Sequence, residues 1–276
     1  MTGTSMIHHT TLSAAIITYN EERNIEDCLN SVTDFVDEII VLDSFSIDNT
    51  EFICRKNPKV KFSQHPFDGY AQQKNRALEM CSSEWIISVD ADERVSPELR
   101  QSIIRFLSGN PKPKIAGVKF PRLTYHMHTY IRHGGWYPNR RYRLVRKGMA
   151  YWGGENPHDR IILKGKGKTI QGDLIHYTAR DLSDQVNTIN HFSSIAALVR
   201  YNKGKKYRLW RLLLKPVSKF IETYLYRCGF LDGTQGFIIA VSSSYASFIK
   251  EAKQFELDVL GSDKPSNLSA LYKKER

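Results

Sequence analysis

In the first third of the chain, short runs of apolar residues alternate with stretches in which apolar residues recur at helical spacing. The short runs have the composition of β-strands and cover residues 12–18, 38–42, 60–62 and 85–89. The stretches between them are predicted helices, the first with Ile25, Cys28, Leu29 and Val32 on one face and Asn20 as its N-cap. Strands that alternate with helices form a mostly parallel sheet with helices on both faces. We therefore expect an α/β fold.

Polar side chains stand at the carboxyl ends of three predicted strands. They are Thr18, Tyr19 and Asn20 after the first strand, Asp43 after the second, and Asp90 and Asp92 after the fourth. Ligands bind beyond the carboxyl ends of strands in such sheets, so we expect one shared site. Residues i and i+2 of a strand point the same way, so Asp90 and Asp92 could hold a divalent cation and, through it, a phosphate. The alternative is a solvated turn that leads into a helix at Ser96 and Pro97.

The composition is that of a packed globular protein. Hydrophobic residues make up 41% of the 276 residues and aromatic residues 11%, which argues against disorder. The four cysteines form no C-x-x-C pair and are expected to be reduced and mostly buried, as in a cytoplasmic protein. We expect no signal peptide in residues 1–11, and no apolar run reaches the ~18–20 residues of a membrane-spanning helix.

Positive charge is concentrated in two segments of this chain, whose net charge is +11. Residues 100–154 contain twelve Lys and Arg and no acid, and residues 200–227 contain nine against the single Glu222. Such segments favour an anionic partner, and charge alone leaves nucleic acid, anionic lipid and a phosphorylated substrate open. Neither a G-x-G-x-x-G nor a G-x-x-x-x-G-K-[ST] motif is present, so a dinucleotide fold or a P-loop is not supported.

Arg140, Arg141 and Arg143 crowd the segment that follows a predicted turn at residues 134–138. Arginine binds phosphate and carboxylate groups through paired hydrogen bonds, so these side chains are candidates for holding an anionic ligand. The alternative is that Arg141 and Arg143 form the solvated face of a strand, with Tyr142 and Leu144 inward.

Three motifs resemble those of the family 2 glycosyltransferases, which have the GT-A fold. The motifs are Thr18-Tyr19-Asn20-Glu21-Glu22, residues 41–50 with Asp43 and Asp48, and Asp90-Ala91-Asp92. Their order and spacing match the family, and the resemblance covers residues 12 to about 180, with one departure at Phe45, where the family often has Gly. It implies a Rossmann-like, mixed but mostly parallel sheet, here followed by a C-terminal helical extension.

The resemblance implies a nucleotide-sugar site and a metal site at the strand ends. The donor would contact Thr18, Tyr19, Asn20, Glu21, Asp43, Lys74 and Asp90. Lys74 could equally be a surface lysine. Most lone histidines are structural, but GT-A enzymes often supply a late histidine as a metal ligand, and His176 falls at that place. Asp92 and His176 would then bind Mn²⁺ or Mg²⁺ together with diphosphate and water.

Glu155 and Asp159 are the first acids after the long basic segment, and either is a candidate general base. The alternative for Asp159 is an ion pair with Arg160 or another nearby arginine. The His158-Asp159 pair resembles the corresponding step in lipopolysaccharide-core glycosyltransferases of family 2. The resemblance therefore favours Asp159 as the base, with Glu155 as the fallback.

The expected organisation is an N-terminal tail (1–11), a GT-A catalytic domain (12–180), a helical region (181–260) and a flexible tail (261–276). In the helical region, apolar residues are interleaved with Lys and Arg, and Pro216 is predicted to kink a helix. One interpretation is a bundle that packs on the catalytic domain or on a second subunit, as in a homo-oligomer. The interpretation we favour is a basic amphipathic surface that lies on anionic membrane.

The function that the resemblance implies is an inverting, metal-dependent glycosyl transfer. The resemblance favours UDP-glucose as the donor, and implies as acceptor a lipid-linked or lipopolysaccharide-core glycan at the inner face of the cytoplasmic membrane. One rival is a sugar-1-phosphate nucleotidyltransferase, which usually carries a Gly-rich basic loop where Tyr19-Asn20-Glu21-Glu22 stands. The other is a nucleic-acid-binding protein, but carboxylates at three strand ends would repel phosphates unless a metal intervened.

Overall fold

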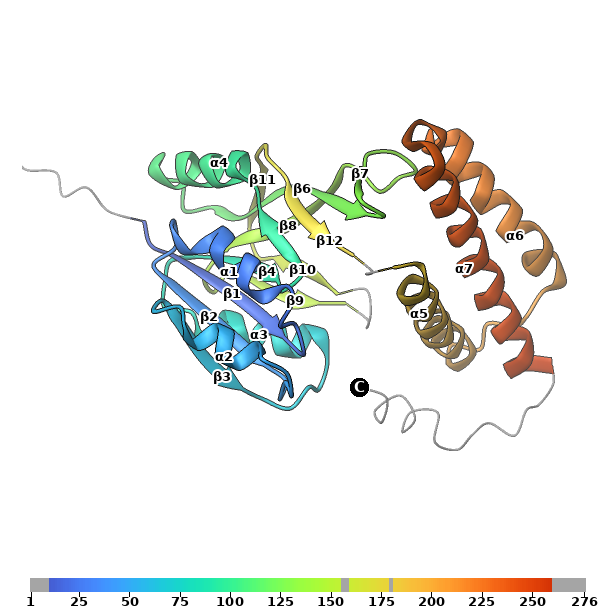
Figure 1. Cartoon of the computed structure of the whole chain (residues 1–276), viewed down its shortest axis with the longest axis horizontal. Coiled ribbons are helices and arrows are strands. Elements are labelled where there is room, and N and C mark those ends of the chain that lie inside the picture. Colours follow the sequence, from blue (N-terminus) through green and yellow to red (C-terminus); the bar gives the residue numbers. More distant parts are fainter. Residues whose placement is uncertain (1–9, 155–158, 179–180, 260–276) are drawn as a thin grey trace, which may run out of the picture. The chain divides into compact units, whose positions relative to one another are not determined.

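The computed structural model of the chain describes residues 10–154, 159–178 and 181–259 (Figure 1). These residues form two compact units. The first lies within residues 1–125 and 138–178, and the second within residues 126–137 and 179–276. The expected tail at residues 261–276 lies outside the described residues.

The first unit is built on a mixed sheet with the strand order β3-β2-β1-β4-β8-β6-β12-β5. Its parallel part is β1 (Leu12–Thr18), β2 (Glu38–Asp43), β3 (Val60–Gln64) and β4 (Trp85–Asp90). The other strands on this path are β5 (Glu93–Val95), β6 (Ile115–His126), β8 (Asn139–Arg146) and β12 (Leu174–Tyr177). β8 is antiparallel to both β4 and β6, and β12 is parallel to β6 but antiparallel to β5. The predicted α/β class is confirmed.

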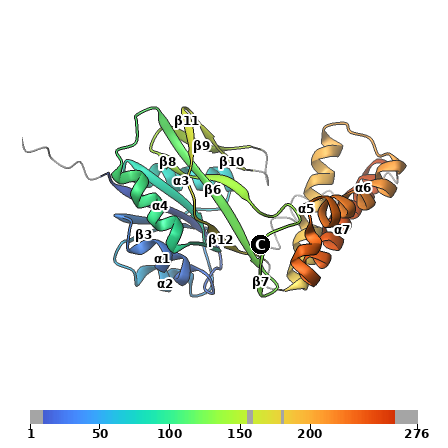
Figure 2. The same ribbon diagram turned by 90° about the horizontal axis from the view of Figure 1, so that it is seen from above.

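Successive side chains of β1 point into two different cores, because side chains of a strand alternate between its faces. Ala14 and Ile16 belong to one core, and Ala15 belongs to the other. Helices α1 (Ile25–Thr33), α2 (Thr50–Arg55) and α4 (Pro97–Ser108) cover the first core on one side of the sheet (Figure 2). Helix α3 (Tyr70–Met80) and the hairpin of β9 (Ala150–Gly153) and β10 (Arg160–Leu163) cover the second. A further strand, β11 (Lys166–Thr169), pairs with β6.

The N-cap predicted for the first helix is wrong. Helix α1 has Asn24 as its N-cap, and Asn20 lies in the preceding turn with a φ of 54°. Its Oδ1 accepts a hydrogen bond from the backbone N–H of Ile47 at 2.9 Å. The side chain of Asn20 therefore joins the turn after β1 to the turn after β2 and does not cap a helix. Helix α1 begins at Ile25.

The second unit consists of helices α5 (Leu182–Asn202), α6 (Leu209–Ile221) and α7 (Gly233–Val259), with two short helical turns between the last two and the small strand β7 (Thr129–Ile131). Both α5 and α6 pack against α7. Helix α6 continues through Pro216, whose carbonyl accepts a hydrogen bond from the Ser244 hydroxyl of α7. Among the described residues, no helix combines the length and hydropathy needed to cross a membrane.

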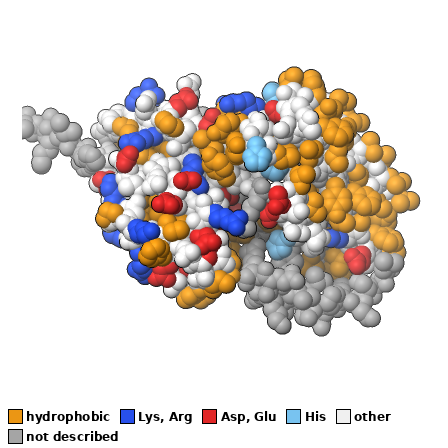
Figure 3. Space-filling model, viewed as in Figure 1, with side chains coloured by type: hydrophobic (Ala, Val, Ile, Leu, Met, Phe, Trp, Pro, Cys, Tyr) orange, Lys and Arg blue, Asp and Glu red, His pale blue; other side chains and the backbone are white. Residues whose placement is uncertain are grey.

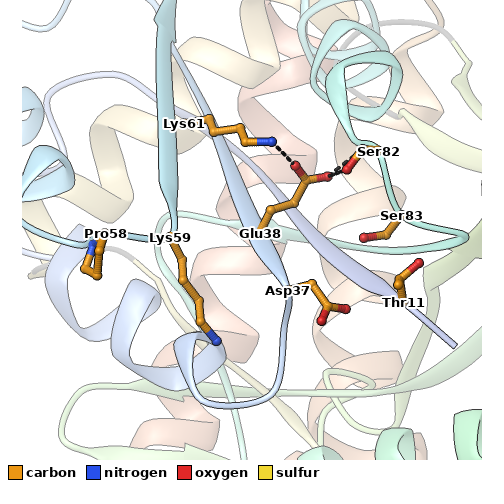
Figure 4. A pocket seen from close by; sticks show the side chains of 8 residues that line it. All are labelled: Thr11, Asp37, Glu38, Pro58, Lys59, Lys61, Ser82 and Ser83. Atoms are coloured by element: carbon orange, nitrogen blue, oxygen red, sulfur yellow. Dashed lines mark hydrogen bonds and ion pairs between the residues drawn. The ribbon is translucent and has the colours of Figure 1, made fainter. Parts of the chain in front are cut away.

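A cavity of about 450 Å³ lies at the amino ends of β1, β2 and β4, at the opposite end of these strands from the polar motifs (Figure 4). Glu38 lines it, and its carboxylate accepts hydrogen bonds from Ser13, Ser82 and Lys61. Burial by itself would raise the pKa of Glu38, but these hydrogen bonds outweigh burial and lower the pKa to about 2. The carboxylate of Glu38 therefore links β2 to β1, to β3 and to the segment before β4.

We predict that ionisation of Glu38 makes the stability of the fold depend on pH in the acid range. A carboxylate whose pKa is lower in the folded state stabilises the fold above its unfolded pKa, here near 4.5, and this contribution is lost as the pH falls toward 2. The urea midpoint of Glu38→Gln should therefore fall less than that of the wild type between pH 5 and pH 2.5. Glu26→Gln, at an exposed position of α1, is the control and should follow the wild type. Equal acid sensitivity of Glu38→Gln and the wild type would contradict the assignment.

Candidate active site

Two cations hold the carboxylate of Asp90 where β4 ends. Lys74 of α3 places Nζ 3.0 Å from Oδ1, and Arg143 of β8 donates to Oδ2 at 2.7 Å. Both cations are buried, so Lys74 is not the surface lysine of the alternative interpretation. Burial would raise the pKa of Asp90, but Arg143 and Lys74 outweigh burial and hold that pKa well below its usual range. Asp90 is therefore a fixed, ionised carboxylate at the strand end.

Glu93 is a second, fully buried carboxylate on the same arginine. Its Oε1 accepts a hydrogen bond from Arg143 at 2.8 Å and lies 3.4 Å from Arg122, and its Oε2 accepts the backbone N–H of Asp90 at 3.0 Å. Burial raises the pKa of Glu93, and the charge of Asp90 adds to this, while Arg143 opposes it. The sequence pattern does not single out Glu93, although its place directly after the Asp-x-Asp motif was an available signal.

Trp152 of β9 lies against both cations. Its ring centroid is 4.3 Å from Nζ of Lys74 and 5.2 Å from the guanidinium carbon of Arg143, which are favourable cation–π distances. Asn75 fixes the backbone of Trp152, because its side chain donates to the carbonyl at 2.8 Å and accepts from the N–H at 2.7 Å. Neither residue was singled out from the sequence, since their contact joins positions far apart along the chain.

Lys74 also contacts Asp159, the favoured candidate base. The distance from Nζ to Oδ2 of Asp159 is 3.1 Å, and the Asp159 side chain is 14% exposed. Lys74 therefore bridges Asp90 and Asp159. The cation paired with Asp159 is this lysine and not the arginine that the alternative interpretation predicted. Glu155, the fallback base, and the neighbouring His158 lie outside the described residues.

Asp92 has a different partner from Asp90. Strand β4 ends at Asp90, and Asp92 lies in the turn before β5. The expectation that residues i and i+2 of a strand point the same way therefore does not apply to this pair. Oδ2 of Asp92 lies 3.1 Å from Nε2 of His176. Strand β12 brings His176 there, since the N–H of Tyr177 donates to the carbonyl of Asp92 at 2.9 Å. The structure thus brings the two expected metal ligands together.

The Asp92 and His176 atoms fit a divalent cation that is shared with a ligand. Donor atoms at adjacent corners of an octahedron with bonds of ~2.1 Å lie ~3 Å apart, and the observed separation is 3.1 Å. No group of three or more His, Cys, Asp or Glu side chains that could hold a metal occurs within residues 10–154, 159–178 and 181–259. Magnesium-type sites often have only one or two protein ligands and take the rest from phosphates and water.

The predicted donor-binding residues meet at the carboxyl ends of β1 and β2. Thr18 pairs with Asp43 in the parallel register of the two strands. The Thr18 hydroxyl is buried and has no hydrogen-bond partner among the described residues, whereas both oxygens of Asp43 accept hydrogen bonds from Ser46. Tyr19 is 38% exposed beside them. Glu21 begins the next segment, where its N–H donates to the hydroxyl of Thr50 at 2.8 Å.

Phe45 occupies the turn after β2 in a left-handed conformation, with a φ of 62°. Glycine adopts this conformation without steric cost, which accounts for the glycine often found here in the resembling family. The ring of Phe45 is 51% exposed, and Asp43 still accepts the N–H of Ser46 across the turn at 2.8 Å. The substitution therefore keeps the turn that Asp43 organises.

The three candidate anion-binding arginines divide into two kinds. Arg140 and Arg141 are exposed on β8. The solvated-face alternative therefore holds for Arg141 but is wrong for Arg143, which is buried against Asp90 and Glu93. Burial of part of Arg141, and then repulsion from Arg122 and Arg143, lower the pKa of Arg141. Positive charge is thus crowded on this surface, which favours an anionic ligand at Arg140 and Arg141.

The chain resembles known proteins in sequence and in structure. Residues 13–162 match the family described as Glycosyl transferase family 2. The lipopolysaccharide core biosynthesis glycosyltransferase LpsC of Rhizobium meliloti is 30% identical, and the match covers 92% of this chain and 96% of that protein.

Two solved structures have a similar fold. The mannosyltransferase PcManGT of Pyrobaculum calidifontis, in complex with GDP-Man and Mn²⁺, has a TM-score of 0.55 at 12% identity, with 88% of this chain and 86% of that chain covered. TarS of S. aureus, in complex with UDP-GlcNAc, has a TM-score of 0.50 at 14% identity, with 90% and 91% covered.

We predict that Arg143→Met lowers the free energy of unfolding by about 3 kcal/mol, because it leaves the buried Glu93 and Asp90 without their shared cation. Arg141→Met, on the same strand but exposed, should change it by no more than about 0.5 kcal/mol. Urea unfolding followed by circular dichroism measures both. Equal effects of the two substitutions would mean that Arg143 does not hold the cluster together.

Proposed function

The chain belongs to glycosyl transferase family 2 and has the GT-A fold, and from this premise we propose an inverting, metal-dependent transfer of glucose from UDP-glucose to a lipid-linked or lipopolysaccharide-core glycan. The name of the relative LpsC supports the acceptor class. The bound UDP-GlcNAc and GDP-Man of the two similar structures support a nucleotide-sugar donor. UDP and glucose are our choices within that class.

The observation that carries the proposal is the bridge made by Lys74. It joins Asp90, at the strand end where the donor is expected, to Asp159, the candidate base, through contacts of 3.0 and 3.1 Å. A transferase needs a base beside the donor, on the side from which the acceptor attacks. The contacts of Lys74 with both acids support a base that lies beside the donor site.

In the proposed reaction, Asp159 accepts the proton of an acceptor hydroxyl as that oxygen bonds to the anomeric carbon. The bond from this carbon to the diphosphate breaks, and the electron pair leaves with UDP. A single displacement of this kind converts an α-linked donor into a β-glycoside. Lys74 positions Asp159, and Trp152 keeps Lys74 beside it through the cation–π contact.

On the donor side, Thr18, Tyr19, Asn20, Glu21 and Asp43 are proposed to hold the nucleoside. The unpartnered hydroxyl of Thr18 supports a ligand at this edge. Asp92 and His176 are proposed to hold Mn²⁺ or Mg²⁺, which would offset the charge that develops on the leaving diphosphate. Asp90 is already held by Lys74 and Arg143, so its proposed part is to orient these cations beside the donor.

Arg140 and Arg141 are proposed to bind phosphate groups of the acceptor. Their exposure on β8 and the crowding of positive charge around Arg141 support this assignment. Arg143, which was grouped with them on sequence, is instead proposed to support Asp90 and Glu93. The proposed place of work is the cytoplasmic side of the membrane, where nucleotide sugars are made available to such acceptors. The nucleotidyltransferase and nucleic-acid-binding alternatives are set aside because the chain is a family 2 glycosyltransferase.

We predict that UDP binds in the presence of Mn²⁺ and that EDTA weakens this binding at least tenfold. Asp92→Ala should weaken it similarly, because loss of a metal ligand removes the link between protein and diphosphate. Isothermal titration calorimetry measures both, with Asp27→Ala, an exposed acid, as the matched control. UDP binding that neither EDTA nor Asp92→Ala alters would exclude the proposed metal site.

We predict that Asp159→Asn lowers turnover by ~10²–10⁴-fold while UDP-glucose binds within about twofold of wild type, since a general base contributes a factor of this size. Release of UDP in the presence of purified core oligosaccharide measures turnover. Asp27→Asn is the control and should keep wild-type turnover. Near-wild-type turnover of Asp159→Asn would remove Asp159 from the role of base.

A further inference from the structure

Helices α5, α6 and α7 bury several polar side chains and leave many apolar side chains exposed. In α7, Glu251 and Gln254 are buried, at 2% and 0% exposure, and Glu251 pairs with Arg200 of α5 at 2.5 Å. Helix α6 has no buried residue along its whole length. A helix of a globular protein ordinarily turns its apolar stripe inward, whereas the outer side of these helices has no apolar partner among residues 10–154, 159–178 and 181–259.

Exposed apolar side chains form a stripe on each of the two outer helices. On α6 they are 48–60% exposed and recur at helical spacing, at Trp210, Leu213, Leu214, Val217 and Ile221. On α7 they are 41–47% exposed, at Phe237, Val241, Tyr245 and Phe248. The two helices pack against each other, and Figure 3 shows hydrophobic side chains gathered over them. We call the residues of these two stripes the apolar face.

Positive charge accompanies the apolar face. Arg211, Lys215 and Lys219 recur every four residues along α6, beside its apolar stripe. Further exposed cations stand just before the helix, at Lys203, Lys205, Lys206 and Arg208. The acid that follows α6, Glu222, is paired with Lys219 at 3.0 Å and with Arg227 at 2.7 Å. The surface is therefore apolar and cationic at once, with its nearest acid neutralised.

We propose that the apolar face lies in the interface of an anionic lipid bilayer, with α6 in the plane of the membrane. Basic amphipathic helices bind there because apolar burial and attraction to anionic headgroups act together. Trp210 and Tyr245 on the face are of the residue types that favour this interface. A second copy of the chain fits less well, because a two-fold contact through α6 would bring its row of cations close to the same row of the partner.

All residues of the apolar face lie in α6 and α7, whereas the residues proposed to bind donor and acceptor belong to the first unit. The membrane proposal is therefore independent of the proposed function. If both hold, the membrane contact keeps the enzyme on the surface that carries a lipid-linked acceptor.

Flotation of the full chain with vesicles tests the proposal. One set contains phosphatidylcholine and phosphatidylglycerol in a 70:30 ratio, and the other contains phosphatidylcholine alone. We expect binding to the anionic vesicles at least tenfold tighter than to the neutral ones. We also expect a loss of at least tenfold in Leu213→Ser/Val217→Ser and a clear loss in Lys215→Glu, because these remove apolar burial and charge from the face. Phe52→Ser/Ile104→Ser, which removes exposed apolar side chains of the first unit, is the matched control and should bind as the wild type does.

Three outcomes would overturn the proposal. One is wild-type protein that does not float with anionic vesicles. Another is Leu213→Ser/Val217→Ser that floats as well as the wild type while its circular dichroism spectrum is unchanged. The third is a chain that is dimeric by light scattering, becomes monomeric in that variant, and binds neither kind of vesicle, which would assign the apolar face to a second copy. None of these measurements involves nucleotide sugar or glycan, so they leave the proposed reaction untouched.

Discussion

The first unit depends on one arrangement of charge, in which two buried cations hold the two oxygens of a single carboxylate. Lys74 and Arg143 come from α3 and β8 and meet at Asp90, at the end of β4. Charges of this kind are stable in an interior only when each has partners, because desolvation is costly. Glu93 and Trp152 also contact Arg143, and Trp152 and Asp159 also contact Lys74. The positions of the helix, the two strands and the hairpin around the site are thereby fixed relative to one another.

The same arrangement gives the two acids of the Asp-x-Asp motif different partners. Asp90 is committed to cations of the protein itself, and through Lys74 it is linked to Asp159. Asp92 lies beyond the end of the strand, more open to solvent, and has His176 as its partner.

The alternation of strands and helices could be predicted from sequence because buried faces impose their periods on the chain. The same pattern predicted which polar residues stand at the strand ends. The pairing of Asp92 with His176 could be predicted only from the family resemblance. The partners of Lys74 and Arg143 could not be predicted, because contacts such as Lys74 with Asp159 join distant segments and leave no period in the sequence. The N-cap expected at Asn20 is wrong because a turn precedes α1. The strand spacing assumed for Asp90 and Asp92 does not apply because Asp92 lies in a turn. In the helical unit, the mixture of apolar and basic residues was visible, but only the structure shows that the apolar stripes of α6 and α7 face outward.

In the proposed site, Asp92 and His176 hold the metal while Asp90 holds the protein's own cations. The most direct measurement is the anomalous scattering of Mn²⁺ in crystals grown with UDP. We expect a manganese peak within bonding distance of Oδ2 of Asp92 and Nε2 of His176, with the Lys74 and Arg143 contacts to Asp90 unchanged. A peak bonded to Asp90, with Lys74 displaced from it, would show that the metal is held elsewhere than we propose.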